Sequence, residues 1–130
     1  KPAARVRLEY IDGPDVLTSV VAELDGAVVG WQSVGWWHGD PHIGSFVQPG
    51  LQARGTGAAM FALTCDGLCH RGIPSVYASI RLDNVPGLAF YTRAGFVEIS
   101  RQSDFALDDG RVVGRALRRL DLSPRDGALP

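Results

Sequence analysis

The stretch VQPGLQARGTGAAM, from Val47 to Met60, lies between a run of β-forming residues and a long apolar segment with helical periodicity. It contains three glycines, Gly50, Gly55 and Gly57, although a glycine fixed in a fold loses more backbone entropy than any other residue. A loop that wraps tightly around a ligand, with its backbone amides directed inward, would explain them. The stretch therefore raises the question of which ligand the loop binds.

Three interpretations of this loop compete. The first is a plain strand-to-helix connection, in which the glycines only satisfy turn geometry. The second is a dinucleotide-binding fingerprint, because Gly55 to Met60 nearly matches G-x-G-x-x-G. Against it, Met60 is too large for the last position and no β-α-β unit opens the chain. The third is a pyrophosphate site at a helix N-terminus, where free N–H groups and the helix dipole favour an anion.

Alternating and β-branched residues predict several strands before the loop. The dipeptide Asp25-Gly26 separates two of them, and because both residues tolerate positive φ it indicates a two-residue hairpin turn. The segment His38-Gly39-Asp40-Pro41 predicts a further turn. The strands expected here are Val6–Ile11, Val16–Leu24, Ala27–Trp37 and His42–Val47.

After the loop, apolar residues at helical spacing predict two helices, with Gly72 and Gly95 following their ends. The helices are expected at Arg54–His70 and Val85–Ala94, and the strands at Ser75–Leu82, Phe96–Leu107 and Arg111–Leu120. This order predicts an α+β fold with a central mixed, mostly antiparallel twisted sheet flanked by helices. We expect a single domain over residues 1–120 and a flexible C-terminal tail over residues 121–130.

Composition narrows the class of protein. The 130 residues fit one domain, and a hydrophobic share of 45% with 21% charged residues is typical of soluble globular proteins. A formal net charge of -1 argues against a nucleic-acid partner, and no apolar run reaches the ~20 residues that span a bilayer. Cys65 and Cys69, one helical turn apart, are interpreted as small buried side chains in a reducing cytoplasm.

Two motifs in order resemble those of the GNAT superfamily of N-acetyltransferases. The first is Val47-Gln48-Pro49 followed by Gln52-x-x-Gly55-x-Gly57, which resembles the coenzyme A signature. The second is the segment from Asn84 to Phe96, with its Asn, short helix, Tyr and Gly-Phe. The resemblance covers about Val20 to Leu120. It implies a GNAT-like fold, acetyl-CoA (coenzyme A) as cofactor, and transfer of an acetyl or short acyl group to a primary amine of a small molecule or peptide.

The resemblance also implies which residues bind the cofactor. Backbone groups near Phe46 and Val47 would pair with the pantetheine arm, and an amide there would polarise the thioester carbonyl. Asn84 would bind pantetheine amides; ordinary core packing for the first two and helix capping for Asn84 remain alternatives. The amides that would bind the pyrophosphate belong to Gln52, Ala53, Arg54, Gly55, Thr56, Gly57 and Ala58, with a solvated side chain as the alternative for Arg54.

Tyr91 occupies the position of the family's general acid, which would protonate the departing thiolate; a packing aromatic is the alternative. For the general base, Glu23, Asp40 and His42 are candidates, and His42 is preferred because it begins the strand next to the cofactor. Together with His38, Asp40 and His42 also suggest a metal site, but a polar turn is favoured because no fourth ligand is evident. We predict no metal.

The chain departs from the family between the first two strands. Members usually carry two helices there, which form one side of the acceptor site, whereas only Asp12 to Asp15 separates the strands here. A non-catalytic acyl-CoA-binding module, or one half of a tandem acetyltransferase, is therefore the alternative function. Without those helices, apolar surface around Tyr10, Trp36 and Trp37 would be exposed, and a homodimer that buries part of it is expected.

Overall fold

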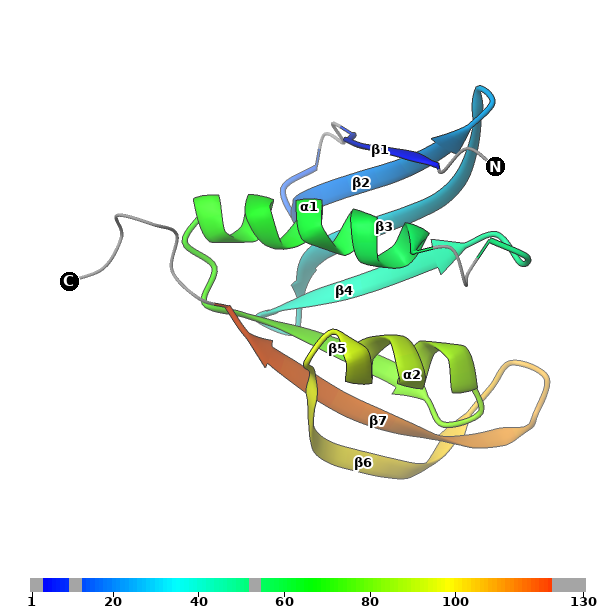
Figure 1. Cartoon of the computed structure of the whole chain (residues 1–130). Coiled ribbons are helices and arrows are strands. Elements are labelled where there is room, and N and C mark those ends of the chain that lie inside the picture. The colour runs from blue at the N-terminus through cyan, green and yellow to red at the C-terminus, as the bar shows by residue number, and fades with distance from the viewer. Residues whose placement is uncertain (1–3, 10–12, 52–54, 123–130) are drawn as a thin grey trace.

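The computed structural model describes residues 4–9, 13–51 and 55–122. It contains one seven-stranded sheet in the order β1-β2-β3-β4-β5-β7-β6. Every neighbouring pair is antiparallel except β4 and β5, which are parallel. Two helices pack on the sheet (Figure 1). The predicted α+β fold, with a mixed and mostly antiparallel sheet flanked by helices, is confirmed. The elements are β1 Arg5–Leu8, β2 Val16–Leu24, β3 Ala27–Trp37, β4 Asp40–Val47, α1 Thr56–His70, β5 Ser75–Arg81, α2 Val85–Arg93, β6 Val97–Ala106 and β7 Val112–Asp121.

The strands β2 and β3 have the predicted bounds, and the turn between them has the predicted conformation, with φ of 53° at Asp25 and 82° at Gly26. The strand β4 begins two residues earlier than expected. His38 and Gly39 also take positive φ, at 50° and 83°, so two residues complete the turn and Asp40 already pairs with Trp37. At the other end of the chain, β7 includes Asp121, and residues 123–130 of the predicted tail lie outside the described residues.

Both helices lie against the same face of the sheet (Figure 1). The rings of Phe61 in α1 and Phe90 in α2 are 6.1 Å apart, so the helices touch each other. The main core lies beneath them, where buried side chains of the sheet meet Phe61, Leu68 and Tyr91. A second cluster around Met60 fixes the first half of α1 over β2 and β3. Cys65 and Cys69 lie on α1, and neither takes part in a disulfide.

The sheet is nearly divided between β4 and β5. Only His42 and Tyr77 form a registered pair across this junction, whereas β3 and β4 pair from Trp37 and Asp40 to Gly30 and Val47. Beyond the junction, the carboxyl-terminal halves of β4 and β5 diverge (Figure 1). The backbone groups of β4 that face β5 there have no registered strand partner in the described part of the chain, so they remain available to a ligand.

Candidate functional site

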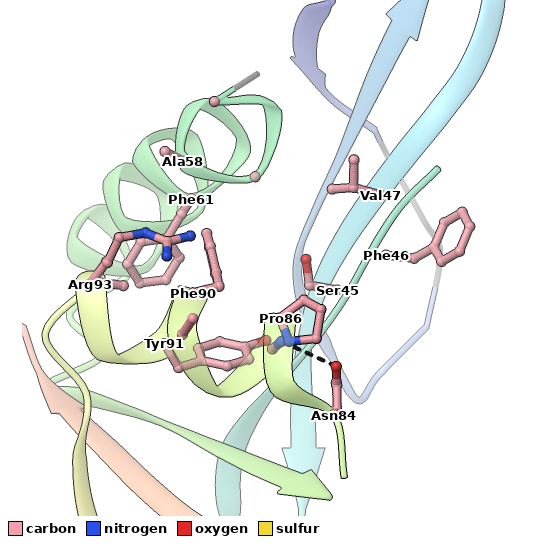
Figure 2. Close-up of a pocket in the computed structure, with 15 residues that line it drawn as sticks. Ser45, Phe46, Val47, Ala58, Phe61, Asn84, Pro86, Phe90, Tyr91 and Arg93 are labelled. Atoms are coloured by element: carbon pink, nitrogen blue, oxygen red, sulfur yellow. Dashed lines mark hydrogen bonds between the residues drawn. The ribbon is translucent and has the colours of Figure 1, made fainter. Parts of the chain in front are cut away.

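A cavity of about 900 Å³ lies between the diverging end of β4, the N-terminus of α1 and helix α2 (Figure 2). Its size is within the range of small-molecule and cofactor sites. Most of its lining is apolar or glycine backbone. The described residues that line it are Ser45, Phe46, Val47, Gly55, Gly57, Ala58, Phe61, Asn84, Pro86, Gly87, Ala89, Phe90, Tyr91, Arg93 and Ala94.

The N-terminus of α1 provides an anion site at one end of this cavity. Gly55 is the N-cap residue, with φ of 77° and no side-chain hydrogen bond to the helix. The first intrahelical bond runs from the Ala59 amide to the Gly55 carbonyl, so the amides of the preceding residues are the free donors of the first turn. No acidic residue occupies that turn. A negatively charged group is therefore favoured there by both the amides and the helix dipole.

Glycine is favoured for different physical reasons at the two remaining glycine positions of the loop, Gly50 and Gly57. Gly50 has φ of 92°, a conformation that disfavours other residues. Gly57 is in the helix, and a Cβ there would lie 3.1 Å from Cε1 of Phe90. The sequence attributed Gly57 to a bound pyrophosphate, but the close contact with Phe90 also favours a small residue at this position.

The predicted loop residues divide into three groups. Gly55, Gly57 and Ala58 line the cavity. Thr56 is buried and does not line it, so only its backbone belongs to the first turn of α1. Gln52, Ala53 and Arg54 lie outside the described residues, and their binding roles stay predictions.

Along β4 the side chains alternate between the two faces of the sheet. Ser45 and Val47 are directed toward the cavity, whereas the ring of Phe46 points to the opposite face (Figure 2) and is 47% exposed. Phe46 can therefore contribute to the cavity only through its backbone. This is the kind of contact that the sequence led us to expect.

Helix α2 is held rigidly at both ends. Oδ1 of Asn84 accepts a hydrogen bond from the Gly87 amide at 3.1 Å (Figure 2), which is a helix N-cap. Near the other end, Nη1 of Arg118 donates to the Leu88 carbonyl at 3.0 Å and to Oγ1 of Thr92 at 2.7 Å. Asn84 thus has the capping role that was its alternative interpretation, and it also lines the cavity.

Tyr91 lies on α2 with its ring directed into the cavity (Figure 2). The side chain is only 7% exposed, and its ring packs edge-on against Phe90 and Phe96, with centroids 5.0 Å from each. Burial raises the pKa of Tyr91 to about 12. The phenol therefore keeps its proton at neutral pH and is available as a donor.

His42 does not line the cavity. His42 is four residues from Phe46 on β4, so both side chains lie on the same face of the sheet, the one away from the helices. There its ring stacks on Tyr77 at 5.7 Å and meets the edge of Trp37 at 4.9 Å. Burial lowers the pKa of His42, an effect opposed by the charge of Asp40 and reinforced by His38. The structure therefore brings Tyr91 together with Gly55 and Gly57 in one cavity, but places His42 at the β4–β5 junction on the opposite face of the sheet.

The other two candidates for the general base are less suited to that role. Glu23 forms an ion pair with Arg7 on β1, and Asp40 is exposed beside the β3–β4 turn.

Within the described ranges, no three His, Cys, Asp or Glu side chains gather as metal ligands. None of the helices in those ranges is long and apolar enough to cross a membrane.

Sequence reasoning missed two polar residues of the cavity. Arg93 is the only charged side chain among the described lining residues, and its position two residues after Tyr91 in the second motif was the available signal. Ser45 is the other, with a polar side chain in a strand that was interpreted through its backbone alone. No pattern in the sequence indicated it.

Comparison with known proteins gives three results. The model of the Acetyltransferase (GNAT) family matches residues 2–96. A mycothiol acetyltransferase of Clavibacter michiganensis subsp. michiganensis is 34% identical over 82 residues, which are 62% of this chain and 26% of that protein. The chain therefore spans about a quarter of the length of this curated relative.

Solved structures share the fold. The crystal structure of ribosomal-protein-alanine N-acetyltransferase from Brucella melitensis superimposes with a TM-score of 0.73 at 22% identity, covering 81% of this chain and 68% of that one. A GNAT superfamily phosphinothricin acetyltransferase from Sinorhizobium meliloti, in complex with AcCoA, gives a TM-score of 0.73 at 19% identity and covers 87% and 68%.

Proposed function

The chain belongs to the Acetyltransferase (GNAT) family, and on that premise we propose that it transfers an acetyl or short acyl group from acetyl-CoA to a primary amine of a small molecule or peptide. The observation that carries the proposal is the cavity beside the diverging strand β4. It has an anion site at one end, apolar sides, and a buried phenol in its lining. The anion site suits the phosphates of acetyl-CoA, the apolar sides suit its pantetheine arm, and the buried phenol suits its thioester.

Cofactor binding is assigned to groups along this cavity. The first-turn amides from Gly55 to Ala58 would bind the pyrophosphate, and the guanidinium of Arg93 would add positive charge to the cavity. Backbone groups near Phe46 and Val47 would pair with the pantetheine arm. Asn84 would contact that arm through its amide nitrogen, because its oxygen already caps α2. Gln52, Ala53 and Arg54 are assigned to the phosphates by motif alone.

When bound, acetyl-CoA supplies a thioester carbon that an amine can attack. Tyr91 holds a proton at Oη and would donate it to the departing sulfur as negative charge develops there. A phenol with a pKa of about 12 is a weak acid. The transfer becomes nearly balanced in energy if burial also raises the pKa of the leaving thiol, as it raises that of Cys65 to about 11.

The general base is assigned to His42. Its lowered pKa keeps the imidazole neutral at pH 7, so it can accept the proton that the acceptor amine must lose before or during its attack, directly or through water. Because His42 lies on the face opposite the cofactor cavity, this assignment has the acceptor amine approach from that face. Trp37 lies against His42 there and would form part of the acceptor site.

The test is release of free thiol from acetyl-CoA in the presence of a panel of amines, combined with calorimetric binding of coenzyme A. Amine-dependent turnover supports the transferase. Binding without turnover with any amine would instead favour a non-catalytic acyl-CoA-binding module, or one half of a tandem acetyltransferase. That alternative is kept because β2 follows β1 without an intervening helix in the described residues. Affinity for a nicotinamide dinucleotide but not for coenzyme A would contradict the proposal.

Two further proposals concern the setting of the protein. Trp36 and Trp37 are 42% and 56% exposed, and a homodimer that covers them is proposed; Tyr10 lies outside the described residues. Sedimentation at high concentration that gives only the 13.9 kDa species would contradict it. A cytoplasmic location is proposed because Cys65 and Cys69 form no disulfide, as expected in a reducing compartment.

A further inference from the structure

Two polar side chains are completely buried between α1 and the sheet. Gln32 in β3 and Thr64 in α1 are both 0% exposed. Buried polar groups need hydrogen-bond partners, and a satisfied network at such a position fixes the orientation of each member. The chain of hydrogen bonds from these two residues leads to the cofactor cavity.

The network has a direction set by its shortest contact. Oγ1 of Thr64 lies 2.5 Å from Oε1 of Gln32 and 3.1 Å from the Met60 carbonyl. A hydroxyl has one proton, and the shorter contact assigns it to Gln32, so the amide nitrogen of Gln32 faces β4. Nε2 of Gln32 donates to Oγ of Ser45 at 3.3 Å. Because an amide N–H can only donate, the Ser45 oxygen accepts this bond and the hydroxyl proton must point elsewhere. Ser45 lines the cavity (Figure 2), so its hydroxyl proton can be donated to a ligand bound there.

The position of Ser45 along β4 indicates which part of the ligand it meets. Val47 lies nearer the α1 terminus, where the phosphates are assigned, and Ser45 lies two residues closer to the junction at His42. Two strand residues correspond to about 6.6 Å. Ser45 therefore lies deeper along the cofactor path, in the same cavity as Tyr91.

We propose that the Ser45 hydroxyl donates a hydrogen bond to the carbonyl oxygen of the bound acyl thioester, and that Gln32 and Thr64 are positioning residues that orient it. The inference rests on the proposed acyl transfer. When the amine attacks the carbonyl carbon, negative charge develops on that oxygen, and a donor already in place stabilises it. The proton stays on Ser45 throughout, so the residue forms and breaks no covalent bond.

The substitution Ser45→Ala removes the donor. We expect kcat with acetyl-CoA to fall at least tenfold, toward the ~10²-fold typical of a lost oxyanion donor. Affinity for coenzyme A, which has no acyl carbonyl, should stay within about twofold of wild type. Ser100→Ala, an exposed position on β6, is the matched control and should change neither quantity. An unchanged kcat in Ser45→Ala overturns the proposal, as does a coenzyme A affinity that falls in step with kcat/KM.

The positioning role is tested by Thr64→Val, which removes the hydroxyl with little change in shape. It should lower kcat in the wild-type background but not in the Ser45→Ala background, because the donor it orients is already absent. Equal losses in both backgrounds would show a general structural effect and overturn the orienting role. Thermal unfolding of each variant establishes that it is folded, and Gln32→Met replaces Thr64→Val if the latter is not.

Measurements on the wild-type protein distinguish the proposed role of Ser45 from the proposed acyl transfer on which it rests. If the wild type binds coenzyme A and turns over, but Ser45→Ala matches it, only the role of Ser45 is wrong. If the wild type does not bind coenzyme A, both proposals are wrong.

Discussion

The substitution Tyr91→Phe tests whether the buried phenol takes part in acyl transfer, because it removes one oxygen atom and keeps the ring. The contacts with Phe90 and Phe96 are ring contacts and remain in place. We therefore expect little change in stability at neutral pH or in coenzyme A affinity. Turnover should fall by ~10²-fold, the scale of a lost proton-transfer group, and kcat and kcat/KM should fall together because the interaction belongs to the transition state.

The same substitution has an independent signature in the pH dependence of stability. Burial raises the pKa of Tyr91 from 10.0 to about 12, so the unfolded chain loses this proton at a lower pH than the folded protein. Between those two values the folded state binds more protons, and the free energy of unfolding falls as pH rises. A difference of two pKa units corresponds to about 3 kcal/mol. Wild type should lose this amount through Tyr91 as pH rises from 10 to about 12, and Tyr91→Phe should not.

Both signatures are measured on the same pair of proteins. Steady-state thiol release and calorimetry give the kinetic part, and urea titrations at a series of alkaline pH values give the stability part. An unaltered kcat would make Tyr91 a structural residue, and a loss that comes entirely from weaker cofactor binding would make it a binding residue. If both proteins lose stability equally at alkaline pH, the phenol is not buried as described and the reasoning about its pKa fails.

Three further predictions concern charge, capping and the base. Arg93→Met should lower coenzyme A affinity about tenfold at low salt, with a smaller difference at high salt; calorimetry at two ionic strengths that shows no difference would contradict a role in phosphate binding. In Gly87→Ala, the new Cβ would clash with Nδ2 of Asn84, so we expect the α2 cap to be lost. Urea titration should then show a free energy of unfolding lower by ~1 kcal/mol, as it should for Asn84→Ala. For His42, a pKa lowered from 6.5 places the acidic limb of kcat/KM below pH 6.5, and His42→Gln should abolish that limb; a limb that persists would assign it to another group.

Much of the fold was predictable because its determinants are local. Residue alternation and positive-φ dipeptides are properties of adjacent positions, and they predicted β2, β3 and the Asp25-Gly26 turn as observed. The start of β4 was predicted wrongly because Asp40 and Pro41 are typical turn residues. Their neighbours His38 and Gly39 complete the turn alone, so pairing with β3 takes precedence over local preference.

The candidate site was only partly predictable, since it depends on which face of the sheet the helices cover. Residue spacing assigns His42 and Ser45 to opposite faces of one strand, but not which of these faces the cavity. The Gln32–Thr64 bond joins residues far apart in sequence, and no local pattern indicates it. Gly57 illustrates a related limit, because a motif explains its presence by a ligand while the structure adds the contact with Phe90.

The single registered pair between β4 and β5 has a mechanical consequence. At five junctions of the sheet, several registered pairs hold neighbouring strands together. The β4–β5 junction has one such pair, so it depends more on other contacts, such as that between Phe61 and Phe90. A molecule that lies along this junction and bonds to both strands adds to the contacts that the shared core already makes between β1–β4 and β5–β7. Its binding energy then counts toward the cohesion of the whole protein, and amide hydrogens in both halves become harder to exchange when it binds.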